Sequence, residues 1–115
     1  MLFELRQYRM RPGQRENWLR FMAEEIVPYA AECRRQHSLP GSAGAVVGSW
    51  VGEQDPDLYV WIRRFDDEAE RTRIYAAINQ SDRWQTYFLP RIDEMIDRDQ
   101  NVVTRLTPTP RSVIR

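Results

Sequence analysis

Residues 58–65 read LYVWIRRF, and two rows of side chains alternate along this stretch. One row holds Leu58, Val60 and Ile62, and the other holds Tyr59, Trp61, Arg63 and Phe65. A period of two predicts a β-strand whose rows lie on opposite faces of a sheet. We expect helices to cover the aliphatic row, because helices bury one face of such a sheet. The reverse assignment, with the aromatic row under the helices, is the alternative.

Three further strands are expected on either side of this stretch. Polar turn residues at 52–57 join it to an apolar run at 44–51, which predicts a β-hairpin. Residues 2–10 alternate in the same way and end at a Pro-Gly turn. The last strand is expected at 101–106.

Apolar residues at helical spacing fill the gaps between the strands. Over 14–36 they predict one long helix, which Pro28 should bend because proline removes a backbone hydrogen bond. A second helix is expected after the third strand, with Asp66 or Asp67 as its N-cap. Arginines such as Arg71 stand among its acidic residues and predict a solvated, salt-bridged surface.

A further helix is expected from Ser81, and it continues past Pro90 to Ile96. The complete order is strand, helix, strand, strand, helices, strand. It predicts an α+β chain with the ferredoxin-like βαββαβ arrangement, a four-stranded antiparallel sheet with helices on one face. We expect one domain over 1–107 and an extended tail over 108–115, where two prolines prevent regular pairing.

The expected sheet leaves a wide aromatic face without helices. This face would carry Tyr8, Tyr59, Trp61 and Phe65, with Arg6 and Arg63 between them. A monomer rarely exposes so much aromatic area to water. We therefore expect a second copy of the chain to cover that face, in a symmetric homodimer.

Four of these residues also form a candidate binding site, namely Arg6, Tyr8, Trp61 and Arg63. Aromatic walls with cationic groups can hold a planar or anionic small molecule. Aromatic residues and arginine are also common at subunit interfaces. The sequence therefore leaves open whether these residues line a ligand pocket or only the dimer seam.

His37 is the only histidine, and it follows Cys33, the only cysteine, by one helical turn. A cysteine beside an imidazole can be an activated nucleophile or half of a metal site. No second histidine or cysteine exists to complete a zinc site, and a histidine at a helix C-terminus is favourable without any function. We keep His37 as a site candidate, and we predict that neither residue binds a metal or is needed for folding.

The overall charge and composition exclude several functional classes. Seventeen basic residues balance seventeen acidic ones, so no net field attracts nucleic acid or anionic lipid. Every basic residue is arginine, which excludes lysine Schiff-base chemistry. No apolar run reaches the ~20 residues of a membrane span. With one cysteine and a charged, alternating start, the chain is expected in a reducing cytoplasm, without a membrane partner.

Several stretches, in order along the chain, match a known family pattern. They are Glu4-Leu5-Arg6-Gln7-Tyr8-Arg9 followed by Arg11-Pro12-Gly13, then Val47-Gly48-Ser49-Trp50, Tyr59 to Asp66, Ser81-Asp82-Arg83-Trp84, and Thr104 to Pro110. The chain resembles a bacterial member of the NIPSNAP family over nearly its whole length. The resemblance implies a dimeric α+β barrel, in which two ferredoxin-like sheets close into one barrel with the helices outside.

The resemblance is less specific about function. The family supplies no agreed catalytic motif, and the wider barrel superfamily includes cofactor-free monooxygenases, isomerases and haem-handling enzymes. We expect the chain to bind a small hydrophobic or aromatic molecule without a cofactor of its own, as a cofactor-free monooxygenase or isomerase. The alternative is a non-catalytic homodimeric interaction module. Neither the ligand nor the presence of a reaction follows from the sequence.

Overall fold

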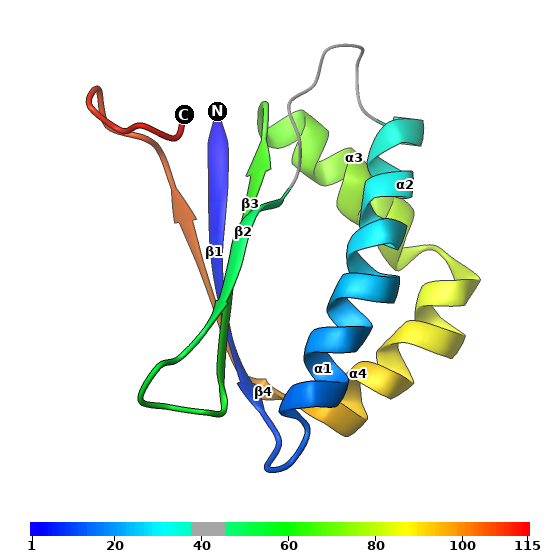
Figure 1. Ribbon diagram of the computed structural model, residues 1–115. Helices are drawn as coiled ribbons and strands as arrows, with labels where there is room; N and C mark the ends of the chain where they lie inside the picture. The colour runs from blue at the N-terminus through cyan, green and yellow to red at the C-terminus, as the bar shows by residue number, and fades with distance from the viewer. Residues whose placement is uncertain (38–45) are drawn as a thin grey trace.

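An antiparallel sheet of four strands carries the helices on one of its faces, in a computed structural model that describes residues 1–37 and 46–115 (Figure 1). The strands are β1 (Leu2–Met10), β2 (Val46–Val51), β3 (Leu58–Phe65) and β4 (Ile96–Leu106). They lie in the order β2-β3-β1-β4, and each neighbouring pair is antiparallel. The predicted α+β, ferredoxin-like fold is confirmed. The first two residues of the predicted second strand, 44 and 45, lie outside the described residues.

One long helical rod spans residues 15–37 and packs across the sheet. It consists of α1 (Arg15–Phe21), a π-helical turn (Met22–Ile26) and α2 (Val27–His37). Pro28 stands just after the π-helical turn. Proline has no N–H to donate, and its ring clashes with the carbonyl one turn earlier, so a widened turn accommodates it. The predicted helix is present, and the irregularity that Pro28 causes takes the form of this π turn.

The second helical region is broken by a turn at residues 80–81, and only its second part has a π-helical turn like that of the first region. It consists of α3 (Glu68–Asn79), a π-helical turn (Trp84–Phe88) and α4 (Leu89–Met95). Asp67 caps α3, because its side chain accepts a hydrogen bond of 2.8 Å from the backbone N–H of Glu70. Pro90 follows its π-helical turn by two residues, as Pro28 does in the first region, and the widened turn accommodates it in the same way. Of the helices in the described ranges, none is long and apolar enough to cross a membrane.

The last strand begins earlier than the sequence predicts. β4 starts at Ile96, which helical spacing places at the end of the preceding helix. The backbone N–H of Arg11 donates to the carbonyl of Met95 over 2.8 Å, and Ile96 pairs with Met10 of β1. Pairing with β1 therefore ends the helix at Met95, and tertiary context overrides the local pattern.

The helices cover the aromatic row of β3, and the expected assignment of the two faces is wrong. Buried under the helices are Tyr59, Trp61, Arg63 and Phe65, whereas Leu58, Val60 and Ile62 are half-buried on the open face. Tyr8 of β1 also points to the helices, and its ring centroid lies 6.1 Å from that of Trp18 in α1. Large rings bury the most apolar area per residue, so they fill the layer between sheet and helices.

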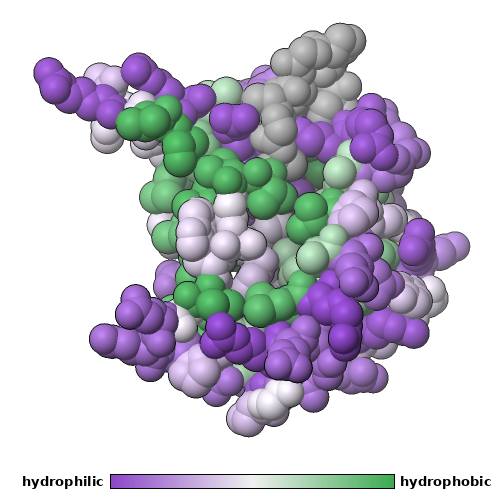
Figure 2. All heavy atoms as spheres, viewed as in Figure 1, coloured by the Kyte–Doolittle hydropathy of each residue, from purple (hydrophilic) through white to green (hydrophobic). Residues whose placement is uncertain are grey.

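The open face of the sheet is aliphatic instead of aromatic. Its row contains Leu5, Val60 and Ile62, with the more exposed Trp50, Val102 and Leu106 beside them. Figure 2 shows hydrophobic side chains gathered over the sheet and toward the C-terminal tail, while hydrophilic residues cover the helical side. An apolar face without helices is therefore present, made of other residues than those expected.

Candidate functional site

A cavity of about 340 Å³ lies between the sheet and the helices. The sheet contributes Arg6, Tyr8, Trp61 and Arg63 to its lining, and the helical layer contributes Trp18, Tyr29, Tyr75 and Trp84. A cavity of this volume can hold a small organic molecule. The structure thus places four of the five candidate residues at one cavity, and it places none of these four on the open face of the sheet.

The register of the strands brings the four sheet residues together. Arg6 pairs with Trp61 across β1 and β3, and Tyr8 pairs with Tyr59 two residues further along. Arg63 lies on the same face as Trp61, because side chains two apart in a strand point to the same side. A slip of one residue would turn all of them away from the cavity.

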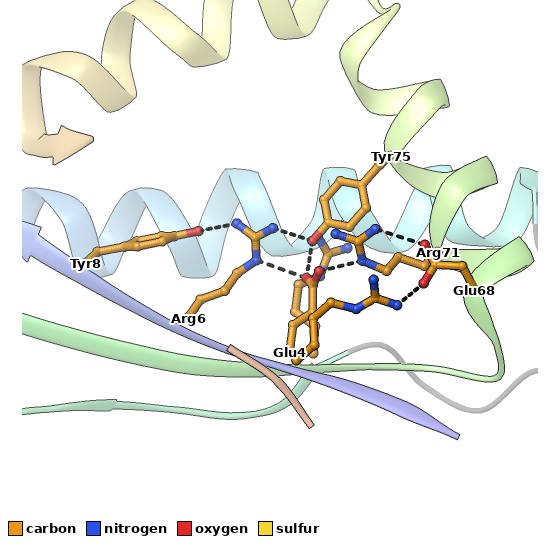
Figure 3. Close-up of polar contacts among 8 residues, drawn as sticks. Glu4, Arg6, Tyr8, Glu68, Arg71 and Tyr75 are labelled. Atoms are coloured by element: carbon orange, nitrogen blue, oxygen red, sulfur yellow. Dashed lines mark hydrogen bonds and ion pairs between the residues drawn. The ribbon is translucent and has the colours of Figure 1, made fainter. Parts of the chain in front are cut away.

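Tyr75 reaches from α3 toward β1 and joins the buried polar groups of the sheet (Figure 3). Its hydroxyl donates to Glu4 Oε1 over 2.5 Å, and it accepts from Arg6 Nη2 over 2.7 Å and from Arg63 Nη1 over 2.9 Å. Glu4 has no exposed surface, and it also accepts from Arg6 Nε over 3.1 Å and from Arg71 Nε over 2.6 Å. One buried carboxylate therefore holds together a phenol and two guanidinium groups.

Tyr75 is neutral in this cluster. Burial raises its pKa above the ordinary value of 10.0, and this outweighs the lowering by the neighbouring charges of Arg63 and Arg6. A neutral phenol has one O–H to donate and two lone pairs that accept. Its bonds to Glu4, Arg6 and Arg63 use all three. Tyr75 therefore fixes α3 against β1 and β3.

Glu4 is ionised at neutral pH in spite of its burial. Burial by itself raises the pKa of this carboxyl group. The hydrogen bond from Tyr75, with the charges and hydrogen bonds of Arg6 and Arg71, outweighs burial and holds the pKa below the ordinary value of 4.5. The cluster therefore contains a carboxylate and not a carboxylic acid.

The ionisation of Glu4 should make stability depend on pH. Its folded-state pKa is the lower one, so its contribution is complete above about pH 4.5 and is lost as the pH falls through the folded-state value. We expect Glu4→Gln to lower the free energy of unfolding most at neutral pH, and the difference from the parent protein to shrink in acid. Urea titrations of both proteins between about pH 7 and pH 3 measure this. A difference that stays constant over that range would contradict the ionised state of Glu4.

Arg63 is buried but only partly hydrogen-bonded. It is 3% exposed, and its guanidinium carbon lies 5.0 Å from the ring centroid of Tyr75 and 5.2 Å from those of Trp61 and Phe65. No ion pair among the described residues includes it, and its Nε and Nη2 have no hydrogen-bond partner there. The indole N–H groups of Trp61 and Trp18 are buried without a partner as well. Buried polar groups are normally paired, so the cavity wall has unused donors.

His37, the fifth candidate, does not reach this cavity. It lies exposed at the end of α2, where its backbone carbonyl accepts from Arg73 Nε over 3.0 Å. Cys33 is buried against Phe65 and Ile74, and both Cys33 and His37 line a separate hollow. In residues 1–37 and 46–115, no group of three or more His, Cys, Asp or Glu side chains is placed to hold a metal ion. The metal-free, dispensable role of His37 and Cys33 stays a prediction.

The sequence places Glu4 on the same strand face as Arg6 and Tyr8, but it did not point to Arg71 or Tyr75 as neighbours of the candidates. Arg71 is expected on a solvated helix surface, but it pairs with the buried Glu4. The spacing of Arg71 and Tyr75 could have indicated that they act together, because residues four apart share one face of a helix, here α3. A glutamate and two arginines in the buried rows of β1 and β3 also need partners from another element, because unpaired buried charges are costly.

Comparisons with known proteins agree with this architecture. A family model described as NIPSNAP matches residues 3–111. The solved structure of a NIPSNAP family protein from Agrobacterium tumefaciens is 23% identical, with a TM-score of 0.80 and coverage of 99% of this chain and 98% of that one. A NIPSNAP family protein with unknown function from the same organism is 25% identical, with a TM-score of 0.78 and coverage of 100% and 94%.

A more distant solved structure has the same fold. It is an antibiotic biosynthesis monooxygenase, 19% identical, with a TM-score of 0.58 and coverage of 96% of this chain and 100% of that one. At this identity the likeness concerns the fold alone. No curated protein matches the chain.

Proposed function

The chain belongs to the NIPSNAP family, and from this premise we propose that it binds a small, flat, largely apolar molecule in the cavity between sheet and helices. The observation that carries the proposal is a cavity of about 340 Å³ lined by aromatic side chains, among residues of which Trp18, Trp61 and Arg63 keep buried N–H groups without a partner in the described chain. Binding sites for small molecules typically have this composition, an apolar wall with a few polar groups that set orientation.

Three of the residues that line the proposed binding site are tryptophans. Trp61 comes from the sheet, and Trp18 and Trp84 come from the helical layer. Trp61 is 4% exposed, so a molecule beside it would be shielded from water on most sides. Flat ligands gain both buried area and ring stacking against such walls.

The reaction class stays a prediction. Cofactor-free oxygenation or isomerisation is what the resemblance implies, and the likeness to an antibiotic biosynthesis monooxygenase supports it only at the level of fold. The side chains at the cavity support binding directly, because Trp61 and Arg63 line it and keep buried N–H groups without a partner among the described residues. We therefore propose that the protein binds a ligand, and the reaction is to be tested on the ligand-bound protein.

We also propose that the open face of the sheet pairs with a second copy of the chain. Its centre, around Leu5, Val60 and Ile62, is apolar, and its charged residues Arg9 and Arg64 lie near the strand ends. Two such centres can meet around a twofold axis without burying a charge. This face also supports the alternative reading of a non-catalytic homodimeric module, and a ligand titration separates the two readings.

The titration uses the four tryptophans as reporters. Trp18, Trp61 and Trp84 line the cavity, whereas Trp50 lies on the open face, 51% exposed. We expect 2-naphthol, a neutral flat probe, to shift the indole N–H signals of Trp61 and Trp18 in ¹H–¹⁵N spectra until the site is saturated. The signal of Trp50 should stay in place and serves as an internal control.

Two results would count against the binding proposal. One is a titration in which only the Trp50 signal moves, because the probe would then lie on the open face. The other is a spectrum that does not change at millimolar 2-naphthol, which favours the non-catalytic module. Signals are assigned with single Trp→Phe variants, so each result refers to a known side chain.

A further inference from the structure

We infer that the molecule bound in this cavity carries a carboxylate or a similar planar anionic group, and that Arg63 holds it. The inference rests on the proposed function, because it names the chemical class of the ligand in the same cavity. Four observations on the lining of the cavity support it.

The first observation is the charge of the lining. Three arginines line the cavity, Arg6, Arg63 and Arg98, and no aspartate or glutamate does so among the described residues. The chain as a whole has as many acidic as basic residues. Arg6 and Arg98 form ion pairs with Glu4 and Asp93, so Arg63 is the lining arginine that no carboxylate of the described chain pairs with and that can attract an anion.

The second observation is the crowding of positive charge around one ring. The guanidinium carbons of Arg6, Arg63 and Arg71 lie 5.3, 5.0 and 5.0 Å from the ring centroid of Tyr75. Glu4 accepts from Arg6 and Arg71, but it forms no ion pair with Arg63. Arg71 also pairs with Glu68, so Glu4 and Glu68 compensate Arg6 and Arg71, and Arg63 is the guanidinium of this group that a bound anion would compensate.

The third observation is which atoms of Arg63 lack a partner. Its Nη1 donates to Tyr75, whereas Nε and Nη2 have no hydrogen-bond partner in the described chain. The Nε and Nη2 hydrogens point the same way along one edge of the guanidinium plane. That edge matches the two oxygens of a carboxylate, which it binds through two parallel hydrogen bonds.

The fourth observation is the contrast with Arg34, the other arginine that is more than nine-tenths buried in the described residues. Arg34 Nη2 donates to Glu70 Oε1 over 2.7 Å, and its Nη1 donates to the carbonyl of Arg64 over 2.9 Å. The fold therefore supplies a carboxylate to the buried arginine that holds elements together. Among residues 1–37 and 46–115, none forms an ion pair with Arg63, which lines the cavity.

The test compares two flat probes of one shape, 2-naphthoate and the neutral 2-naphthamide, by calorimetric titration at neutral pH. We expect the parent protein to bind naphthoate at least about tenfold more tightly, as a charge-assisted bidentate pair requires. Arg63→Met keeps a long, apolar side chain and should abolish this preference without abolishing naphthamide binding. Arg63→Lys keeps the charge and should restore part of the preference.

The outcomes separate this inference from the proposed function. If both probes bind the parent protein equally well, the cavity binds small molecules and the anionic class is wrong. If neither binds, the proposed function falls together with the inference. If Arg63→Met retains the naphthoate preference, another group holds the anion and the assignment to Arg63 is overturned.

A measurement without any ligand provides an independent check. A binding residue that the fold leaves uncompensated should not be needed for folding. We expect Arg63→Met to unfold at a urea concentration equal to or only slightly below that of the parent protein, because it loses the hydrogen bond to Tyr75 but leaves no carboxylate unpaired. Arg34→Met, the matched control, should unfold at a lower concentration, because Glu70 loses its buried partner. Equal destabilisation of the two variants would make Arg63 a structural residue and contradict the inference.

Discussion

Ile62→Asp should dissociate the proposed dimer into monomers. Ile62 lies near the centre of the open face, between Leu5 of β1 and Gly48 of β2. In the proposed dimer an aspartate there would be buried twice, once in each copy, without a cation to pair with it. A buried, unpaired charge at an interface centre costs several kcal/mol, which is more than enough to dissociate a micromolar dimer.

Sedimentation velocity at tens of micromolar measures the effect. Thr72→Asp is the matched control, because it adds the same charge on the exposed surface of α3 and should remain dimeric. Far-UV circular dichroism verifies that Ile62→Asp is still folded. If the parent protein sediments as a monomer, the proposed dimer is wrong. If Ile62→Asp sediments as a dimer, the subunit interface lies on another surface.

Trp61→Ala should lower the free energy of unfolding by about 3–5 kcal/mol, the usual cost of removing a buried indole. The ring of Trp61 lies 6.4 Å from that of Tyr8, and the guanidinium of Arg63 lies 5.2 Å from it. The variant should also lose affinity for 2-naphthol, because one wall of the cavity disappears. It should remain a dimer, since Trp61 and Ile62 lie on opposite faces of β3.

Urea unfolding and the naphthol titration, made on the same preparation, measure both effects of Trp61→Ala. Trp61→Phe is the conservative companion, which keeps a ring at the wall and should lose less stability and less affinity. A Trp61→Ala protein that dissociates into monomers while its cavity still binds naphthol would show that the two faces of β3 have been interchanged.

The strand at 58–65 follows from its sequence, but the choice of its buried face does not. Both rows are apolar enough to be buried, since Leu58, Val60 and Ile62 form one and three aromatic rings form most of the other. The two rows of β3 differ in the partners that the helical layer offers them. Arg63 in the aromatic row finds Tyr75 of α3, and that partner is set by tertiary packing and not by the spacing within β3.

The ends of the helices can likewise be predicted from the sequence only where local features set them. The cap at Asp67 and the proline in the first turn of α4 are local features, and the sequence predicts both correctly. The change from helix to strand at Ile96 depends on pairing with Met10, far away in the chain. Apolar spacing continues through this point, so it gives no sign of the change.

Part of the candidate site can be predicted from the sequence. Residue type and alternation group Arg6, Tyr8, Trp61 and Arg63, because they lie in matching rows of β1 and β3. They do not reveal that the group faces a cavity, because the opposite wall comes from helices elsewhere in the chain. His37 is a candidate because of its residue type and its place one turn after Cys33, and the fold puts it at the far end of α2, away from the cavity.

A crystal structure of the protein with 6-bromo-2-naphthoate tests directly whether the ligand binds in the cavity, because anomalous scattering locates the bromine without ambiguity. We predict one bromine peak in each chain, inside the cavity, with the naphthalene ring against Trp61 and the carboxylate at Nε and Nη2 of Arg63. Peaks confined to the open face of the sheet, or a cavity that stays closed to the probe at saturating concentration, would contradict the assignment of this cavity as the binding site.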